Sequence, residues 1–234
     1  MLKNYKYYTN KFSKDGYVVI KNFFNQREIN DFEKQLLSTY SKYLNVSLNK
    51  KNIHSTVLSN ESNGNHDSLY KALISYTKKK PFKSASKKLT KLSKLFFNKN
   101  FKPIASGMAI GINKSKRTAY EWHQEKPYYK EISTIHYQFP ILNLCNRING
   151  TMSVLAGSHN LGFIKEVVNL KFSKKSINSF VPKRIKQIKK KYPEKFINMK
   201  LTDVVLFNEN IVHRSNSNIS NKVRFAGIIR LIEK

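Results

Sequence analysis

The second half of the chain is a series of short segments rich in β-branched and aromatic residues, and this pattern restricts the possible folds more than any other feature. Gly, Asn or Pro residues separate the segments and are typical turn signals. Many short strands between turns predict a β-sandwich, a barrel or a jelly roll. The six segments cover residues 104–112, 117–123, 132–139, 151–156, 203–207 and 223–232.

The first hundred residues predict helices instead. Asn25 and Glu28 have the spacing of a capping box, and Phe24 and Ile29 stand at the positions of a hydrophobic staple. Apolar residues then recur at spacings of three and four, which predicts a long amphipathic helix after a short strand over residues 16–20.

Three further segments have helical periodicity and one polar segment does not. We expect a helix from about Asp67 that ends before Pro81, another over 84–97, and a basic helix over 181–192 whose lysines face water. The polar stretch 45–66, rich in Asn and Ser, predicts a loop.

The chain carries 44 Lys and Arg residues against 14 Asp and Glu, which gives a formal net charge of +30. Such a surface is typical of nucleic-acid-binding proteins, because it neutralises phosphates. Only seven of the basic residues are Arg, however, and Arg is the residue that reads base edges and forks phosphates. A genome rich in A and T would also give this Lys- and Asn-rich composition. We therefore expect no dedicated nucleic-acid partner, and at most a preference for an anionic small molecule.

The single cysteine, Cys145, excludes a disulfide framework and a cysteine-based zinc site, and it fits a reducing compartment. No stretch approaches the roughly 18 consecutive apolar residues of a membrane span. The first ten residues lack the apolar block of a secretory signal. We expect a cytoplasmic protein that does not enter a membrane, and the sequence makes no prediction about its oligomeric state.

Of the six histidines, His123 alone is followed two residues later by an acid, Glu125. On a strand, residues i and i+2 face the same side, so this pair can bind one metal ion from one side. Two imidazoles and one carboxylate form the ligand set of Fe(II) oxygenases, which leaves positions open for a cosubstrate and O2. A surface histidine beside a solvated carboxylate is the alternative.

A second element lies near the end of the chain. His213 comes just after the apolar segment 204–207, and Arg224 opens the next expected strand. If the two strands pair antiparallel, both side chains line one cavity, where the guanidinium can fork a carboxylate. Alternatively, His213 caps a turn and Arg224 lies on the surface.

Four segments, in this order, resemble signatures of the phytanoyl-CoA dioxygenase family of Fe(II)/2-oxoglutarate-dependent oxygenases, and the likeness runs nearly end to end. They are Phe12–Ile20 ahead of the capped helix, Trp122–Glu125 (WHQE), Asn149–His159 (NGTMSVLAGSH), and His213–Arg224. Glu125 stands where the family usually has Asp; its side chain is one methylene longer but still a hard oxygen ligand. Ala156 stands where Pro is usual.

The resemblance implies a mainly β (α+β) fold with a double-stranded β-helix, the jelly-roll or cupin-like core. In a single domain over residues 1–234, the helical part would span about 1–100 and the jelly roll about 101–234, with one inserted helix. The resemblance also implies that His123, Glu125 and His213 bind Fe(II), and that Arg224 binds the C5 carboxylate of 2-oxoglutarate with Ser220. With O2 as the third component, the implied reaction hydroxylates an unactivated C–H bond of a small molecule and releases succinate and CO2.

Six residues near the metal motif are candidates for contact with the substrate. They are Arg117, Trp122, Tyr128, Tyr129, His136 and Gln138. For the aromatic residues, ordinary packing is an equal alternative. If their segment is extended, only one of Tyr128 and Tyr129 faces the substrate. For His136 a hydrogen-bonded core histidine is the alternative, and we expect His159 to be a structural residue of its turn.

Three other functions stay open at this point: an oxygenase of nucleic acid, a non-catalytic jelly-roll binding protein, and a cupin-like isomerase. The complete set of His123, Glu125, His213 and Arg224 disfavours the second, and the third would not need Arg224. Retention of Glu125 disfavours a halogenase, in which that position is vacant for chloride. No residue identifies the substrate.

Overall fold

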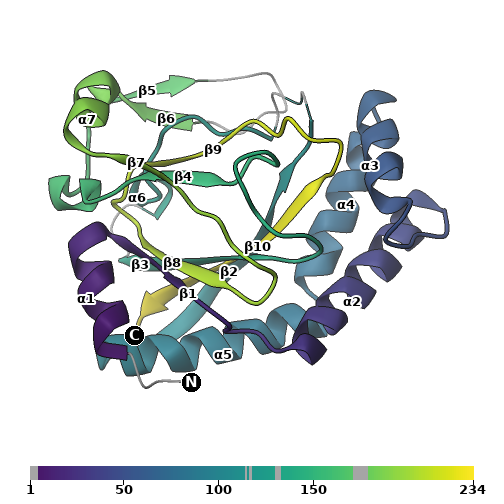
Figure 1. The fold of residues 1–234 in the computed structure, drawn as a ribbon, viewed down its shortest axis with the longest axis horizontal. Helices are drawn as coiled ribbons and strands as arrows, with labels where there is room; N and C mark the ends of the chain where they lie inside the picture. Colours follow the sequence, from purple (N-terminus) through teal and green to yellow (C-terminus); the bar gives the residue numbers. More distant parts are fainter. Residues whose placement is uncertain (1–4, 114, 116–117, 130–132, 171–178) are drawn as a thin grey trace.

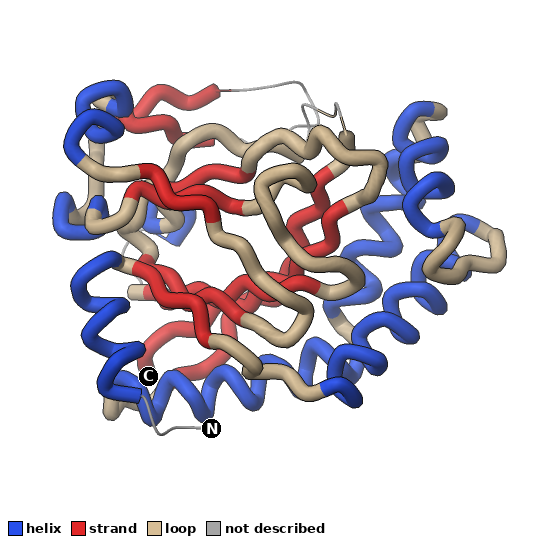
Figure 2. The backbone as a smooth tube through the Cα atoms, viewed as in Figure 1, coloured by secondary structure: helices blue, strands red, loops and turns tan. Residues whose placement is uncertain are grey.

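A computed structural model describes residues 5–113, 115, 118–129, 133–170 and 179–234. Two antiparallel sheets lie one above the other, with helices outside them (Figures 1 and 2). The larger sheet has the order β1 (Tyr17–Ile20), β8 (Val204–Asn208), β3 (Thr134–Pro140), β10 (Arg224–Glu233) and β2 (Phe101–Gly111). The smaller sheet has the order β7 (Glu194–Phe196), β4 (Met152–Leu155) and β9 (His213–Ser215). This two-layered antiparallel arrangement is the expected jelly-roll core.

The helices belong mostly to the first half of the chain. They are α1 (Tyr5–Asp15), α2 (Gln26–Leu44), α3 (Ile53–Ser62), α4 (His66–Thr77) and α5 (Lys80–Phe97), followed by the short α6 (Lys126–Tyr129) and α7 (Ile185–Lys191). A 3₁₀ turn, η1, covers Ser158–Leu161, and β5 (Val167–Leu170) pairs with β6 (Ser179–Pro182) beside α7 (Figure 1).

Successive residues of β3 and β10 face opposite sides of the larger sheet, one toward the helices and the other toward the smaller sheet. Phe139 faces the helices, where its ring packs against Phe24, Phe32 and Phe82 with centroids 5.0 to 5.7 Å apart. His136 and Gln138 point to the opposite face, toward the smaller sheet. On β10, the same alternation turns Phe225, Ile229 and Leu231 toward the helices, and Arg224, Ala226, Ile228 and Arg230 inward.

The capping box was predicted correctly. The Asn25 side chain accepts a hydrogen bond from the Glu28 backbone N–H, and the Glu28 carboxylate accepts one from the Asn25 backbone N–H, both at 2.9 Å. The α2 helix begins directly after this cap and buries Ile29, Phe32 and Leu36 on one face. It therefore covers the aromatic cluster on the larger sheet.

Three local predictions were wrong. The stretch 45–66 contains α3 rather than only a loop, because Ile53 and Val57 are one helical turn apart and both are fully buried. The segment 117–123 forms no named strand in its described residues, 118–123. The basic segment 181–192 starts as the end of β6 and becomes helical only at Ile185.

A search for membrane spans found no helix, among the described residues, that is both long and apolar enough to cross a bilayer.

Candidate metal centre and its cavity

His123, Glu125 and His213 come together in the interior, with one potential ligand atom of each residue within 4.8 Å of the others. The backbone brings the two histidines into place, because each donates its N–H to the carbonyl of the other at 2.9 Å. Glu125 is held by a hydrogen bond from its own N–H to the Glu209 carbonyl at 2.9 Å. All three side chains are nearly excluded from solvent.

In His123 and His213, hydrogen bonding distinguishes Nδ1 from Nε2. Nδ1 of His123 lies 2.6 Å from the carbonyl oxygen of Glu121, and Nδ1 of His213 lies 3.1 Å from that of Ile211. Because a carbonyl oxygen can only accept, each Nδ1 carries the proton and each Nε2 keeps a free lone pair. Both Nε2 atoms face Oε1 of Glu125, at 4.0 Å for His123 and 3.6 Å for His213. This orientation of imidazoles by backbone carbonyls is typical of metal sites.

The protonation states also suit a metal. Burial lowers the pKa of His123 to about 4, so its imidazole is neutral at pH 7. Burial alone would raise the pKa of Glu125, but Arg230, His136 and His213 together outweigh it and hold this pKa well below its usual 4.5. The cluster therefore combines a neutral imidazole with an ionised carboxylate, the forms that bind a divalent cation.

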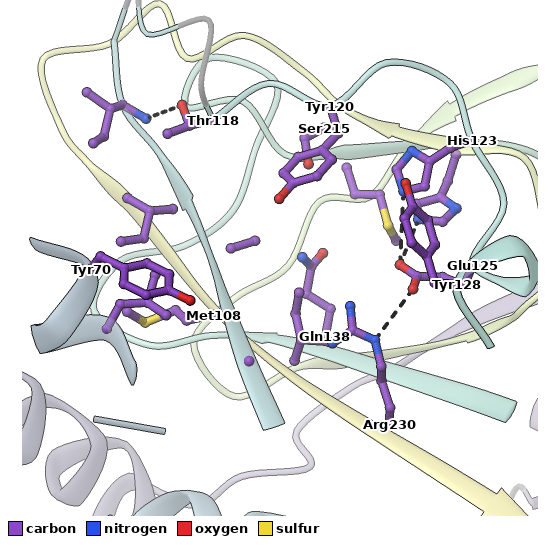
Figure 3. Close-up of a pocket in the computed structure, with 18 of the residues that line it drawn as sticks. Tyr70, Met108, Thr118, Tyr120, His123, Glu125, Tyr128, Gln138, Ser215 and Arg230 are labelled. Atoms are coloured by element: carbon purple, nitrogen blue, oxygen red, sulfur yellow. Dashed lines mark hydrogen bonds and ion pairs between the residues drawn. The ribbon is translucent and has the colours of Figure 1, made fainter. Parts of the chain in front are cut away.

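Arg230 is a residue of this site that the sequence analysis missed. Its Nε lies 3.4 Å from Oε2 of Glu125, and Figure 3 shows the side chain reaching up to that carboxylate from β10. A usable signal existed, because Arg224 and Arg230 are six residues apart on one expected strand and must share a face.

A cavity of about 470 Å³ opens beside the cluster (Figure 3). Its polar wall near the cluster comes from Tyr120, Tyr128, Tyr129, Gln138, Ser215 and Arg230. Its apolar wall comes from Val57, Leu69, Leu73, Met108, Ile110 and Ile112, which belong to α3, α4, and β2 or the residue after it. The N-terminal helices thus supply part of the cavity wall.

The predicted substrate contacts divide into three groups. Gln138, Tyr128 and Tyr129 line the cavity, and both tyrosines can do so because α6 replaces the extended segment that we expected. Trp122 does not line it: it packs against Leu155, Ile188 and Val212, so packing is the right account of this ring. Arg117 lies outside the described residues.

His136 is a core histidine directly beneath the cluster. The Thr134 hydroxyl donates to the Glu209 carboxylate at 2.8 Å and lies 2.8 Å from Nε2 of His136. Since that hydroxyl proton is used, Nε2 must carry its own proton and donate to Thr134. Nδ1 of His136 has no hydrogen-bond partner among the described residues. His159 lies elsewhere, with Nε2 at 3.0 Å from the Ser13 carbonyl oxygen, as expected for a structural residue of its turn.

The strand before His213, β8, does not pair with the strand that Arg224 opens, β10. β8 pairs with β1 and β3, whereas β10 pairs with β2 and β3, so the predicted antiparallel pair was wrong. His213 itself lies on β9, which pairs with β4. Arg224 is fully buried. In the part of the chain that the structure describes, its Nε and both terminal nitrogens have no hydrogen-bond partner, and the Cys145 thiol lies beside them. Arg224 does not line the cavity, although Ile112, one residue beyond its ladder partner Gly111, does.

Ser220 has other partners. Its hydroxyl donates toward Asn218 Oδ1 at 2.7 Å and the Lys222 carbonyl at 3.1 Å, within the turn that precedes β10. Ser220 therefore shapes this turn and does not line the cavity.

Comparisons with known proteins identify the family and the fold of the chain. The family model described as phytanoyl-CoA dioxygenase matches residues 12–226. The apoform of EctD from S. alaskensis superposes with a TM-score of 0.63 at 16% identity, covering 96% of this chain and 75% of that one. AviO1 from Streptomyces viridochromogenes Tue57 superposes with a TM-score of 0.61 at 12% identity, covering 99% of this chain and 96% of that one. The epimerase SnoN, in complex with Fe3+, alpha ketoglutarate and nogalamycin RO, superposes with a TM-score of 0.61 at 11% identity, covering 97% of this chain and 83% of that one. A search of curated proteins gave no match.

Proposed function

Because the chain belongs to the phytanoyl-CoA dioxygenase family and is an Fe(II)- and 2-oxoglutarate-dependent dioxygenase, we propose that it hydroxylates an unactivated C–H bond of a small molecule. Conversion of 2-oxoglutarate to succinate and CO2 would accompany this step. The observation that carries the proposal is the convergence of two free imidazole Nε2 atoms on one ionised carboxylate, next to a cavity.

In this proposal His123, Glu125 and His213 hold the iron. The donor set fits Fe(II), since two imidazoles and one carboxylate on one side leave the remaining coordination positions open toward the cavity. The bound metal would supply the activation of O2 that the side chains cannot perform. The chain itself supplies the neutral imidazole of His123, the ionised carboxylate of Glu125, and the walls of the cavity.

We assign Arg224 to the C5 carboxylate of 2-oxoglutarate. A buried guanidinium whose N–H groups meet no acceptor among the described residues destabilises the folded protein. A carboxylate is the partner that matches the two parallel N–H donors of its planar guanidinium. Ser220 is not included, because its hydroxyl is already bonded to Asn218 and Lys222.

The substrate is proposed to be anionic and partly apolar. The cavity has an apolar wall from α3, α4 and β2, and a polar end with Gln138 and Arg230. The net charge of +30 would raise the rate at which an anion arrives. Structural neighbours also act on small molecules: one EctD structure holds 2-oxoglutarate and 5-hydroxyectoine, and SnoN is an epimerase with nogalamycin RO.

Two broader features belong to the same proposal. We infer that residues 1–234 act as one domain, because α2, α4 and α5 share a hydrophobic cluster with the larger sheet. We also propose a cytoplasmic location, since Cys145 is a free, buried thiol that suits a reducing compartment.

The test measures Fe(II) binding and Fe(II)-dependent succinate release in purified variants. His123→Ala and His213→Ala should lose both, whereas the matched control His159→Ala should keep both. Arg224→Ala should keep the metal and raise the 2-oxoglutarate concentration needed for half-maximal succinate release at least tenfold. Full turnover in either His123→Ala or His213→Ala would rule out this ligand set.

A further inference from the structure

The two carboxylate oxygens of Glu125 face different partners. Oε1 points toward Nε2 of His123 and Nε2 of His213, at 4.0 and 3.6 Å. Oε2 points away from them, with Arg230 Nε at 3.4 Å and His136 Nδ1 at 3.8 Å. The side chain is therefore oriented so that one oxygen faces the ligand cluster and the other faces β10 and β3.

Of these two neighbours of Oε2, Arg230 alone can donate a hydrogen. Nε2 of His136 donates to the Thr134 hydroxyl, so Nδ1 of the neutral ring carries only a lone pair. A lone pair facing a carboxylate oxygen gives no attraction. The guanidinium of Arg230 bears a permanent charge, and its ion pair with Oε2 at 3.4 Å sets the position of that oxygen, although Nε makes no hydrogen bond among the described residues.

The backbone and the cavity wall hold Arg230 in turn. On β10 it stands opposite His136 of β3 and Ala105 of β2, in the middle of the larger sheet. Its guanidinium carbon lies 5.9 Å from the centre of the Tyr129 ring.

We propose that Arg230 is a positioning residue that binds Oε2 of Glu125 and thereby presents Oε1 alone to the metal. Glu has one more rotatable bond than Asp, so a glutamate ligand needs a partner to restrict its carboxylate. Arg230 supplies that restriction. The inference rests on the proposed function only in requiring that the cluster bind a divalent metal.

An opposing effect makes the proposal testable. A guanidinium near a divalent cation also repels it, so removal of Arg230 has two opposite consequences. Loss of positioning would weaken metal binding, and loss of repulsion would strengthen it. Partners of this kind typically change metal affinity about 10- to 100-fold, and we expect positioning to dominate.

The experiment is a Co(II) titration followed by visible absorption, without 2-oxoglutarate or substrate. We expect Arg230→Ala to weaken Co(II) binding about tenfold and to change the absorption band as the carboxylate reorients. Arg230→Lys, which restores a cation, should recover part of the affinity. Arg147→Ala is the matched control, because Arg147 lies over the Phe196 ring outside the cavity, and it should bind Co(II) as the wild type does.

A double-mutant cycle tests the contact itself. In Glu125→Asp the carboxylate is one methylene further from Arg230, so adding Arg230→Ala should change Co(II) affinity less than it does in the wild type. If Arg230→Ala does not fold, Arg230→Lys and Arg230→Gln take its place, with weaker Co(II) binding expected for Arg230→Gln.

The results separate this inference from the proposed function. Wild-type or tighter Co(II) binding in Arg230→Ala, with binding lost in His123→Ala, would overturn the positioning role alone. Normal Co(II) binding in His123→Ala and His213→Ala would overturn the metal centre itself.

Discussion

The hydroxyl of Ser158 accepts a hydrogen bond from the backbone N–H of Val212 at 2.9 Å, and both residues are fully buried. Val212 immediately precedes His213, and its carbonyl accepts a hydrogen bond from the Leu155 N–H at 2.8 Å. Gly157, with φ at +84°, allows the tight turn that places Ser158 there. The Gly-Ser-His segment thus stabilises the strand that carries His213. It is not itself part of the candidate metal centre.

Replacing Ser158 with Ala should therefore destabilise the protein and weaken the metal centre. The substitution leaves the buried Val212 N–H without an acceptor, which costs about 1–3 kcal/mol. Urea unfolding measures this loss, and a Co(II) titration measures the accompanying weaker binding. Ser55→Ala is the control, because the Ser55 hydroxyl bonds on the exposed side of α3, and it should change stability by less than about 0.5 kcal/mol. Equal effects of the two substitutions would contradict the prediction.

The candidate ligand trio could be predicted because short motifs carry the resemblance to the family that implies it. Local spacing alone gave the pair His123 and Glu125, two residues apart, and placed His213 after an apolar strand. For Arg230, local spacing indicates only that it shares a strand face with Arg224. Its contact with Glu125 depends on the pairing of β10 with β3, which places it opposite His136, nearly one hundred positions earlier in the chain.

The same distinction between local sequence and long-range contacts explains the errors in the predicted fold. The long helix α2 has a capping box and an apolar face, so local sequence specifies it. The helix α3 lacks a side-chain cap and buries only Ile53 and Val57, so tertiary contacts decide its conformation. The partner of β9 is likewise a long-range choice: Val154 of β4, rather than any residue of β10, lies opposite His213.

Gly150 should tolerate substitution far less than Gly64, although both have φ near +80°. An alanine Cβ at Gly150 would lie 2.5 Å from the backbone oxygen of Asn216, whereas one at Gly64 would meet nothing within 4 Å. Gly64→Ala should cost the left-handed backbone penalty alone, roughly 1–2 kcal/mol. Gly150→Ala should cost clearly more, because backbone atoms must move. Urea unfolding of the two variants tests this, and equal losses would show that the close approach to Asn216 has no effect.

Thr134 should be necessary for the polar network under the metal centre. Its hydroxyl joins the Glu209 carboxylate to His136 at 2.8 Å on each side. Thr134→Val keeps the shape but leaves the N–H of His136 unpaired, with an expected loss of about 1–3 kcal/mol. Thr90→Val is the control, since the Thr90 hydroxyl bonds only the Ser86 carbonyl one turn back in α5. Thermal unfolding should separate the variants, and similar transition temperatures would argue against the network.

Asp203 should make stability depend on pH in the acid range. Its buried carboxylate accepts hydrogen bonds from Lys21 Nζ at 2.9 Å, the Asn22 N–H at 3.1 Å and the Lys200 N–H at 3.0 Å. These bonds link the end of β1 to the turn before β8. Burial alone would raise the pKa of Asp203, but the hydrogen bond from Lys21 and the two backbone bonds outweigh it and lower this pKa below 3.8.

A carboxyl group with a lowered pKa in the folded state binds protons more readily after unfolding. Its contribution to the free energy of unfolding is therefore fully present above pH 3.8, the ordinary value, and is lost as the pH falls through the folded-state pKa. Asp203→Asn should destabilise the protein at pH 7 by about 1.5–3 kcal/mol, the usual contribution of a charged hydrogen bond. The difference from the wild type should stay constant down to about pH 5 and shrink toward pH 3. Urea unfolding at pH 7, 5 and 3 checks this, with Asp31→Asn on the exposed face of α2 as the control. A difference that is as large at pH 3 as at pH 7 would mean that the charge of Asp203 does not stabilise the link between β1 and β8.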